Sequence, residues 1–127
     1  MINTVYGILL GGLLIFSTPE MPTVPFVEPE LMRVTCYVPT GNKTASGVYP
    51  YVGSCAAKRE WIGGAVALYT LDGEFVTYLS IEDTGGHERI KSGKSIDVFM
   101  PDMKSAREWI KKYGDYMMVQ VFPKAEG

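Results

Sequence analysis

Short segments in which hydrophobic and polar residues alternate fill the chain from Leu31 onward, and Gly, Asn or Asp residues separate them. Segments of this kind, rich in β-branched and aromatic residues, are typical of β-strands. The Asp72-Gly73 pair favours a tight hairpin between two of them. The pattern predicts strands over residues 32–38, 65–70, 75–81, 95–100 and 116–122, and a short strand around residues 54–57.

Between the last two predicted strands, the spacing of apolar residues changes to that of a helix. Asp102 is a typical N-cap residue, and Gly114 is typical of a helix C-terminus. The apolar stripe should pack against the core. It consists of Met103, Ala106, Trp109, Ile110 and Tyr113. The chain is therefore expected to be mainly β, with one α-helix before the last strand.

The first 30 residues differ from the rest of the chain. Residues 5–16 are apolar apart from three glycines. This run is shorter than the roughly 20 residues that span a bilayer and fits the roughly 7–15 residues of a secretory signal core. We expect residues 1–18 to be a signal-like or membrane-anchor segment, the alternative being a buried element of the domain. Residues 19–30 carry four prolines and three glutamates, which favours an extended linker and leaves residues 31–127 as the folded domain.

Composition excludes several classes of partner. The chain has 14 acidic and 12 basic residues and a net charge of -2, with no run of Lys or Arg to follow a nucleic-acid backbone. One histidine and two cysteines cannot by themselves supply the about four ligands of a structural zinc site. Residues 93–95 resemble the end of a phosphate-binding loop, but Glu88 stands where that loop requires glycine. We therefore expect no nucleic acid, no metal and no cofactor.

Cys36 and Cys55, the only two cysteines in the sequence, lie 19 residues apart. A disulfide between them would stabilise an exported domain by roughly 3 kcal/mol, because it restricts the unfolded chain. Two buried free thiols are the alternative, since unpaired cysteine packs as a small hydrophobe. The sequence leaves both states open.

Two aspartates stand in strand contexts that suggest acid/base chemistry. Asp83 continues the largely apolar face of Phe75, Leu79 and Ile81, just before two glycines end the strand. Burial would raise its pKa, as a general acid requires, although an aspartate there can also cap a turn. Asp97 lies inside a predicted strand, where aspartate is disfavoured. If two such carboxylates lie close together, their pKa values move apart, and the pair could serve as acid and base in glycosidic bond cleavage.

Three motifs precede the predicted helix and last strand: Thr-Ala-Ser-Gly at residues 44–47, Ile-Glu-Asp-Thr-Gly-Gly at residues 81–86 and Ile-Asp-Val-Phe at residues 96–99. In order and character they resemble the 3D-domain family, which is named for three aspartates. That family has a double-psi β-barrel fold related to that of membrane-bound lytic transglycosylase A. The resemblance covers roughly residues 32–122 and implies a six-stranded double-psi β-barrel.

The resemblance also implies an activity. Lytic transglycosylases cut the β-1,4 bond between N-acetylmuramic acid and N-acetylglucosamine in peptidoglycan without adding water, and the muramic acid C6 hydroxyl attacks C1 to leave a 1,6-anhydro ring. Asp83 and Asp97 match the acid/base positions, and Thr44 and Ser46 would line the groove. The implied partner is a peptidoglycan glycan strand. The expected location is outside the cytoplasmic membrane, with the protein acting as a monomer.

One position departs from the family pattern. Lys58 stands where the first aspartate is expected, and Glu60 is a candidate substitute two residues further on. The residues expected to contact substrate besides Thr44 and Ser46 are Tyr37, Lys58, Gly85, Gly86 and His87, although a lone loop histidine is also explained by simple solvent exposure. The alternatives to a transglycosylase are a non-catalytic barrel that binds wall glycan or a protein, and a hydrolase acting on the same bond.

Overall fold

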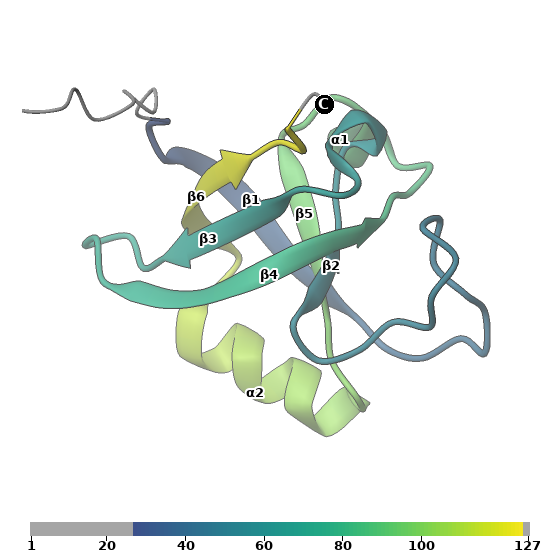
Figure 1. The fold of residues 1–127 in the computed structure, drawn as a ribbon. Helices are drawn as coiled ribbons and strands as arrows, with labels where there is room; N and C mark the ends of the chain where they lie inside the picture. Colours follow the sequence, from purple (N-terminus) through teal and green to yellow (C-terminus); the bar gives the residue numbers. More distant parts are fainter. Residues whose placement is uncertain (1–26, 126–127) are drawn as a thin grey trace, which may run out of the picture.

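Six strands close into a barrel in the computed structural model, which describes residues 27–125 of the chain (Figure 1). The mainly β prediction is confirmed, and each predicted strand is present. The strands are β1 Glu30–Tyr37, β2 Ser54–Ala56, β3 Ala65–Tyr69, β4 Phe75–Asp83, β5 Ser95–Phe99 and β6 Tyr116–Phe122. The signal-like or anchor segment predicted over residues 1–18, and most of the predicted linker, lie outside the described residues.

The barrel is mixed, with the strand order β1-β5-β2-β4-β3-β6. The pairs β1–β5 and β2–β4 are parallel, and the other four pairs are antiparallel. Parallel neighbours need crossover connections, so the chain must pass across the barrel between them. This arrangement is compatible with a double-psi β-barrel.

The predicted Asp-Gly hairpin joins β3 to β4. The Thr70 N–H donates to the Glu74 carbonyl at 2.8 Å, and the Gly73 N–H donates to the Thr70 carbonyl at 3.0 Å. Gly73 has a φ of +92°, a backbone conformation that glycine adopts without strain. The hairpin carries exposed Phe75 at the start of β4, so the predicted apolar face of β4 is buried only from Leu79 onward.

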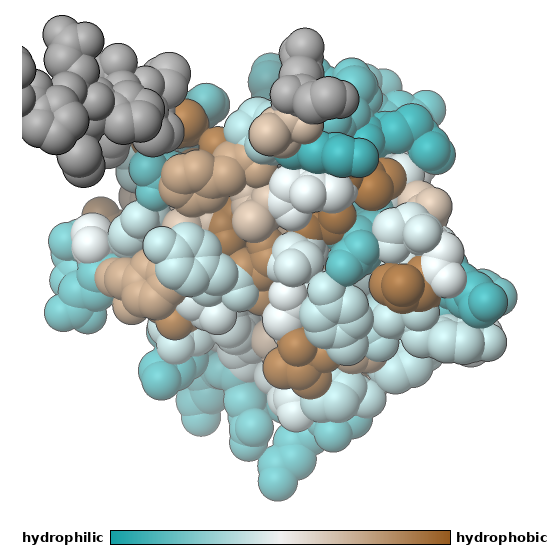
Figure 2. Space-filling model, in the orientation of Figure 1, coloured by the Kyte–Doolittle hydropathy of each residue, from teal (hydrophilic) through white to brown (hydrophobic). Residues whose placement is uncertain are grey.

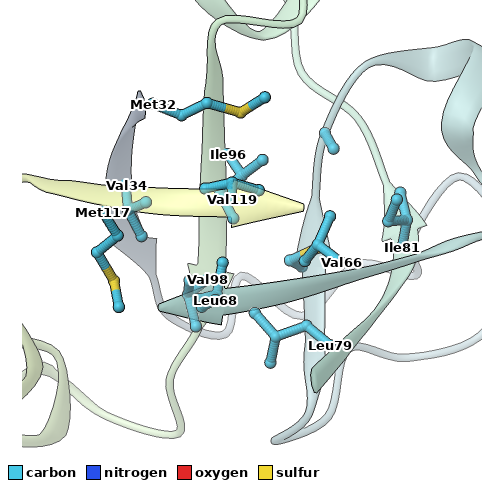
Figure 3. Close-up of a cluster of buried hydrophobic side chains, with 12 residues drawn as sticks. Met32, Val34, Val66, Leu68, Leu79, Ile81, Ile96, Val98, Met117 and Val119 are labelled. Carbon is cyan, nitrogen blue, oxygen red and sulfur yellow. The ribbon is translucent and has the colours of Figure 1, made fainter. Parts of the chain in front are cut away.

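Alternating side chains from all six strands fill the barrel interior (Figure 3). The interior cluster consists of Met32, Val34, Cys55, Ala57, Val66, Leu68, Leu79, Ile81, Ile96, Val98, Met117 and Val119. Burying a large apolar side chain contributes roughly 1.5–3 kcal/mol, so this cluster is the main source of stability. Because side chains occupy the interior, a ligand site is expected on the outside of the barrel wall.

The predicted helix is α2, Met103–Tyr113, which packs beside β1 (Figure 1). Asp102 caps it by accepting a 2.7 Å hydrogen bond from the Ser105 N–H. Trp109 packs against the core cluster, as predicted. Met103 does not: it is 55% exposed, so the buried stripe begins one turn later at Ala106.

Two short helical segments were not predicted: η1, Arg59–Trp61, and α1, Glu88–Lys91. Both lie in connections between strands, where a single turn gives no helical period to detect. Within residues 27–125, no helix has the length and hydropathy needed to span a membrane.

Candidate functional site

Asp83 and Asp97 lie on either side of Ala56 in the barrel wall. Ala56 of β2 is the Cα partner of Asp83 on β4 and of Asp97 on β5. Neighbouring strands are about 4.8 Å apart, so the two aspartate Cα atoms are on the order of 10 Å apart. The fold therefore brings together two carboxylates that sequence patterns could not connect.

A register shift sets the position of Asp83. The pairing of β2 with β4 runs Cys55↔Ile81 and then Ala56↔Asp83, so Glu82 is the additional residue of a bulge. A regular strand would have placed Glu82 opposite Ala56. Bulges commonly redirect side chains next to active sites, and here the bulge places Asp83 level with Asp97.

Asp97 is partly buried and has one side-chain hydrogen-bond partner among the described residues. The Thr35 hydroxyl donates to Asp97 Oδ1 at 2.9 Å from the adjacent position on β1. Burial raises the pKa of Asp97 above its ordinary value; the Thr35 hydrogen bond opposes the rise, and the negative charge of Asp83 adds to it. Asp97 thus has surroundings that favour a protonated carboxyl group, the form a general acid needs.

Asp83 is held by backbone donors. Its Oδ1 atom accepts hydrogen bonds from the Ala45 N–H at 3.0 Å and from the Thr84 N–H at 2.9 Å. The predicted turn-capping role is therefore present. Both bonds use one oxygen, and no described residue donates to Oδ2, which leaves that atom available to a ligand.

The Thr-Ala-Ser-Gly segment docks onto this end of β4. The Ser46 N–H donates to the Glu82 carbonyl at 3.0 Å, and the Ser46 hydroxyl donates to Glu82 Oε1 at 2.8 Å. Tyr51, from the same loop, donates to Glu82 Oε2 at 2.6 Å. Thr44 is buried, and its hydroxyl donates to the Val48 carbonyl at 2.7 Å, closing the loop on itself. Two of the motifs recognised in the sequence are thus in direct contact.

The predicted contact residue Tyr37 lies near both carboxylates. Its ring packs edge-on against the ring of Phe99, with 5.4 Å between the ring centres. Its hydroxyl is buried without a hydrogen-bond partner among the described residues. The nearby Ser54 hydroxyl donates instead to the Tyr51 carbonyl at 2.6 Å. Burial and then the charge of Asp83 raise the pKa of Tyr37 to about 12, so the phenol remains protonated at neutral pH.

A pocket of about 550 Å³ opens beside Asp83. Its walls come from the loop after β1, from η1, from the turn after β4 and from α1. The residues that line it are Lys43, Thr44, Ala45, Arg59, Glu60, Asp83, Thr84, Gly85, Gly86 and Lys91. Five of the predicted site residues are therefore part of one pocket wall: Thr44, Glu60, Asp83, Gly85 and Gly86. We call it the Asp83 pocket.

The other five predicted site residues lie outside this lining: Tyr37, Ser46, Lys58, His87 and Asp97. Lys58 precedes η1, where its ammonium group pairs with Glu60 Oε2 at 3.8 Å and lies 5.8 Å from the centre of the Trp61 ring. His87 caps α1 by accepting a hydrogen bond from the Arg89 N–H on Nδ1 at 3.2 Å. A helix-capping role therefore accounts for His87 without a ligand.

Cys36 and Cys55 are both free thiols in the structure. Each is the Cα partner of Val98, which separates them by two strand spacings. Since a disulfide requires Cα atoms within about 7 Å, this register keeps the sulfurs apart. Burial is the main cause that raises the pKa of Cys36 to about 11 and that of Cys55 to about 12.

Sequence reasoning missed Thr35, Glu82 and the basic residues of the Asp83 pocket. Thr35 meets Asp97 only through the register of β1 with β5, which no local pattern reveals. Glu82 could have been recognised from its place in the sequence, because an acidic residue next to Asp83 at the end of a strand can accept hydrogen bonds from a neighbouring loop.

No group of three or more His, Cys, Asp or Glu side chains among residues 27–125 is arranged to hold a metal ion. The sequence matches no model of a known protein family, and no characterised protein matches it significantly.

Proposed function

We propose that this protein is a peptidoglycan lytic transglycosylase of the 3D-domain kind. The observation that carries the proposal is the placement of Asp83 and Asp97 on either side of Ala56. Beside Asp83, the Thr-Ala-Ser-Gly and Asp-Thr-Gly-Gly segments form two walls of one pocket. A glycosidic bond next to two carboxylates with different surroundings is the arrangement that acid/base cleavage of sugars requires.

Asp97 is the general acid in this proposal. Its raised pKa favours a bound proton, which it gives to the departing O4 oxygen of N-acetylglucosamine as the C1–O4 bond of muramic acid breaks. The Thr35 hydroxyl holds Asp97 Oδ1 and so sets the direction of the carboxyl group.

Asp83 is the base. Its Oδ2 atom accepts the proton of the muramic acid C6 hydroxyl while O6 forms the new bond to C1. One C–O bond breaks and one forms within the glycan, one proton leaves Asp97 and one arrives at Asp83, and no water is consumed. Proton exchange with solvent then restores both carboxyl groups.

Glu60 and Lys58 modify this site relative to the family pattern. Glu60 lines the Asp83 pocket, which supports its proposed role as a substitute for the missing first aspartate. Its ion pair with Lys58 is long and exposed, and such pairs contribute at most about 1 kcal/mol, so substrate can displace it. The substrate is then a glycan strand of the wall, met outside the cytoplasmic membrane by a monomer that residues 1–18 export or anchor.

The test is to incubate the full chain with purified sacculi and to identify soluble muropeptides by mass spectrometry. Asp83→Asn and Asp97→Asn should each lower the rate of release by at least about 100-fold, the usual contribution of a general acid or base. Asp102→Asn is the matched control, because asparagine also caps helices and Asp102 lies in the cap of α2. Equal loss of activity in the control, or full activity in both site variants, would reject the assignment.

A non-catalytic barrel that binds wall glycan is the second candidate. It is favoured by the presence of Lys58, paired with Glu60, where the family has an aspartate. Under this alternative, the folded protein attaches saturably to sacculi, and no soluble fragment appears. A sedimentation assay with wild-type protein separates the two functions, since a transglycosylase releases product during the same incubation.

A further inference from the structure

Three basic side chains border the Asp83 pocket. Lys43 comes from the loop after β1, Arg59 from η1 and Lys91 from the end of α1. Residues far apart in the sequence thus supply three positive charges to one opening. Figure 2 shows hydrophilic residues gathered over the side of the molecule that carries α1.

Among residues 27–125, no carboxylate forms an ion pair with any of these three side chains. Within residues 27–125, the ion pair of the region joins Lys58 to Glu60, and none of the three bordering cations has an acidic partner within 4.0 Å. Lys43 lies 5.6 Å from the centre of the Tyr49 ring, which orders its stem without cancelling its charge.

The two acidic residues of the pocket leave a positive excess. Glu60 already shares its charge with Lys58, and Asp83 accepts hydrogen bonds from two backbone N–H groups. The three bordering cations therefore outnumber the two carboxylates of the pocket, and Lys58 adds a fourth positive charge beside Glu60. A neutral sugar would leave these cations without partners, whereas an anionic group would pair with them.

We propose that Lys43, Arg59 and Lys91 bind a carboxylate carried by the muramic acid residue, so that the pocket selects acidic glycan over neutral N-acetylglucosamine polymers. The inference rests on the proposed function, because it places muramic acid in the Asp83 pocket. The lactyl ether on C3 of muramic acid carries a carboxyl group on the same ring as the reacting C1. In wall that bears stem peptides this group is an amide, and the carboxylates belong to the peptide instead.

The experiment measures binding rather than cleavage. The probes are the disaccharide N-acetylglucosaminyl-N-acetylmuramic acid, the same disaccharide carrying an L-alanyl-D-glutamate stem, and neutral diacetylchitobiose. None contains the muramic acid to glucosamine bond, so the full chain cannot turn them over as a transglycosylase. Titrations by calorimetry at low and high NaCl give the affinities of the wild type and of Lys43→Gln, Arg59→Gln and Lys91→Gln, with Lys104→Gln on exposed α2 as the control.

We expect at least one acidic disaccharide to bind about 5- to 30-fold more tightly than chitobiose at low salt, the effect of a few partly exposed ion pairs. Each of the three variants should reduce this preference, high salt should reduce it further, and Lys104→Gln should keep it. If the disaccharide with the free lactyl group binds most tightly, the carboxylate that is recognised is that of the lactyl group. If the disaccharide with the stem binds most tightly, the carboxylate is that of the peptide. Equal binding of all three probes, no binding of any, or a preference unchanged by the variants would overturn the inference; release of anhydro-muropeptides from sacculi would then still support the proposed function.

Discussion

Glu82 is predicted to hold the loop of residues 38–53 on the barrel, so removing its carboxylate should lower the free energy of unfolding by a measurable amount. Glu82→Ala removes the acceptors of the Ser46 hydroxyl at 2.8 Å and the Tyr51 hydroxyl at 2.6 Å. Hydrogen bonds to charged groups contribute about 1.5–3 kcal/mol when buried. Ser46 and Tyr51 are exposed, so water replaces part of each bond. We therefore expect a total loss of about 1–2 kcal/mol, which is less than two fully buried bonds of this kind would contribute.

A double-mutant cycle isolates the Glu82–Tyr51 contact. Chemical denaturation of Glu82→Ala, Tyr51→Phe and the double variant should give a coupling of about 0.5–1 kcal/mol. For a domain of this size, a loss of about 1–2 kcal/mol corresponds to a fall in Tm of roughly 4–16 °C. Glu108→Ala on α2 is the control and should change stability little, because the Glu108 carboxylate has no hydrogen-bond or ion-pair partner among the described residues.

A second measurement checks the same contact independently of stability. The hydrogen bond to Glu82 is the main cause that raises the pKa of Tyr51. Glu82→Ala should therefore lower the pKa of Tyr51, which NMR of labelled tyrosine can follow. An unchanged Tyr51 titration together with a coupling near zero would refute the docking of this loop through Glu82.

Three further predictions follow from burial and packing. Asp97→Asn should be at least as stable as the wild type at pH 7 and should differ little from it at pH 4. The pKa of Asp97 is raised above its ordinary value of 3.8 in the folded protein, so its contribution to stability is lost as the pH rises above 3.8. Urea unfolding at the two pH values tests the sign, and a variant less stable than the wild type at pH 7 contradicts it. Cys36 and Cys55, with pKa values raised to about 11 and about 12, should react with a thiol reagent far more slowly in the folded protein than after unfolding; equally fast native labelling would show that they are accessible. Gly64→Ala should destabilise the fold by about 2 kcal/mol or more, since a Cβ there would lie 2.3 Å from a backbone oxygen of β6, whereas Gly86→Ala meets open space and should be nearly neutral in denaturation.

The elements of the fold were predictable because their signals are local. Alternation identified the strands, Asp72-Gly73 identified the hairpin, and Asp102 identified the start of α2. Each signal depends on residues only a few positions apart in the sequence. Met103 was assigned wrongly to the buried stripe, because periodicity does not reveal where the barrel surface ends beneath a helix.

The candidate site was only partly predictable because it depends on register. Asp83 and Asp97 could be named from their contexts, yet their common neighbour Ala56 is known only from the pairing of three strands. The bulge at Glu82 adds a one-residue shift that alternation cannot anticipate. The cations of the Asp83 pocket come from three separate connections, and Arg59 and Lys91 lie on turns too short to give a periodic signal.

The most direct test of the central claim is digestion of purified sacculi by the full chain in water enriched in oxygen-18, with mass spectrometry of the soluble muropeptides. The account predicts anhydro-muropeptides without oxygen-18, formed by the wild type and lost in Asp83→Asn and Asp97→Asn. Products that carry oxygen-18 would show a hydrolase, and a folded protein that releases nothing would show that the two carboxylates beside Ala56 do not cleave the wall.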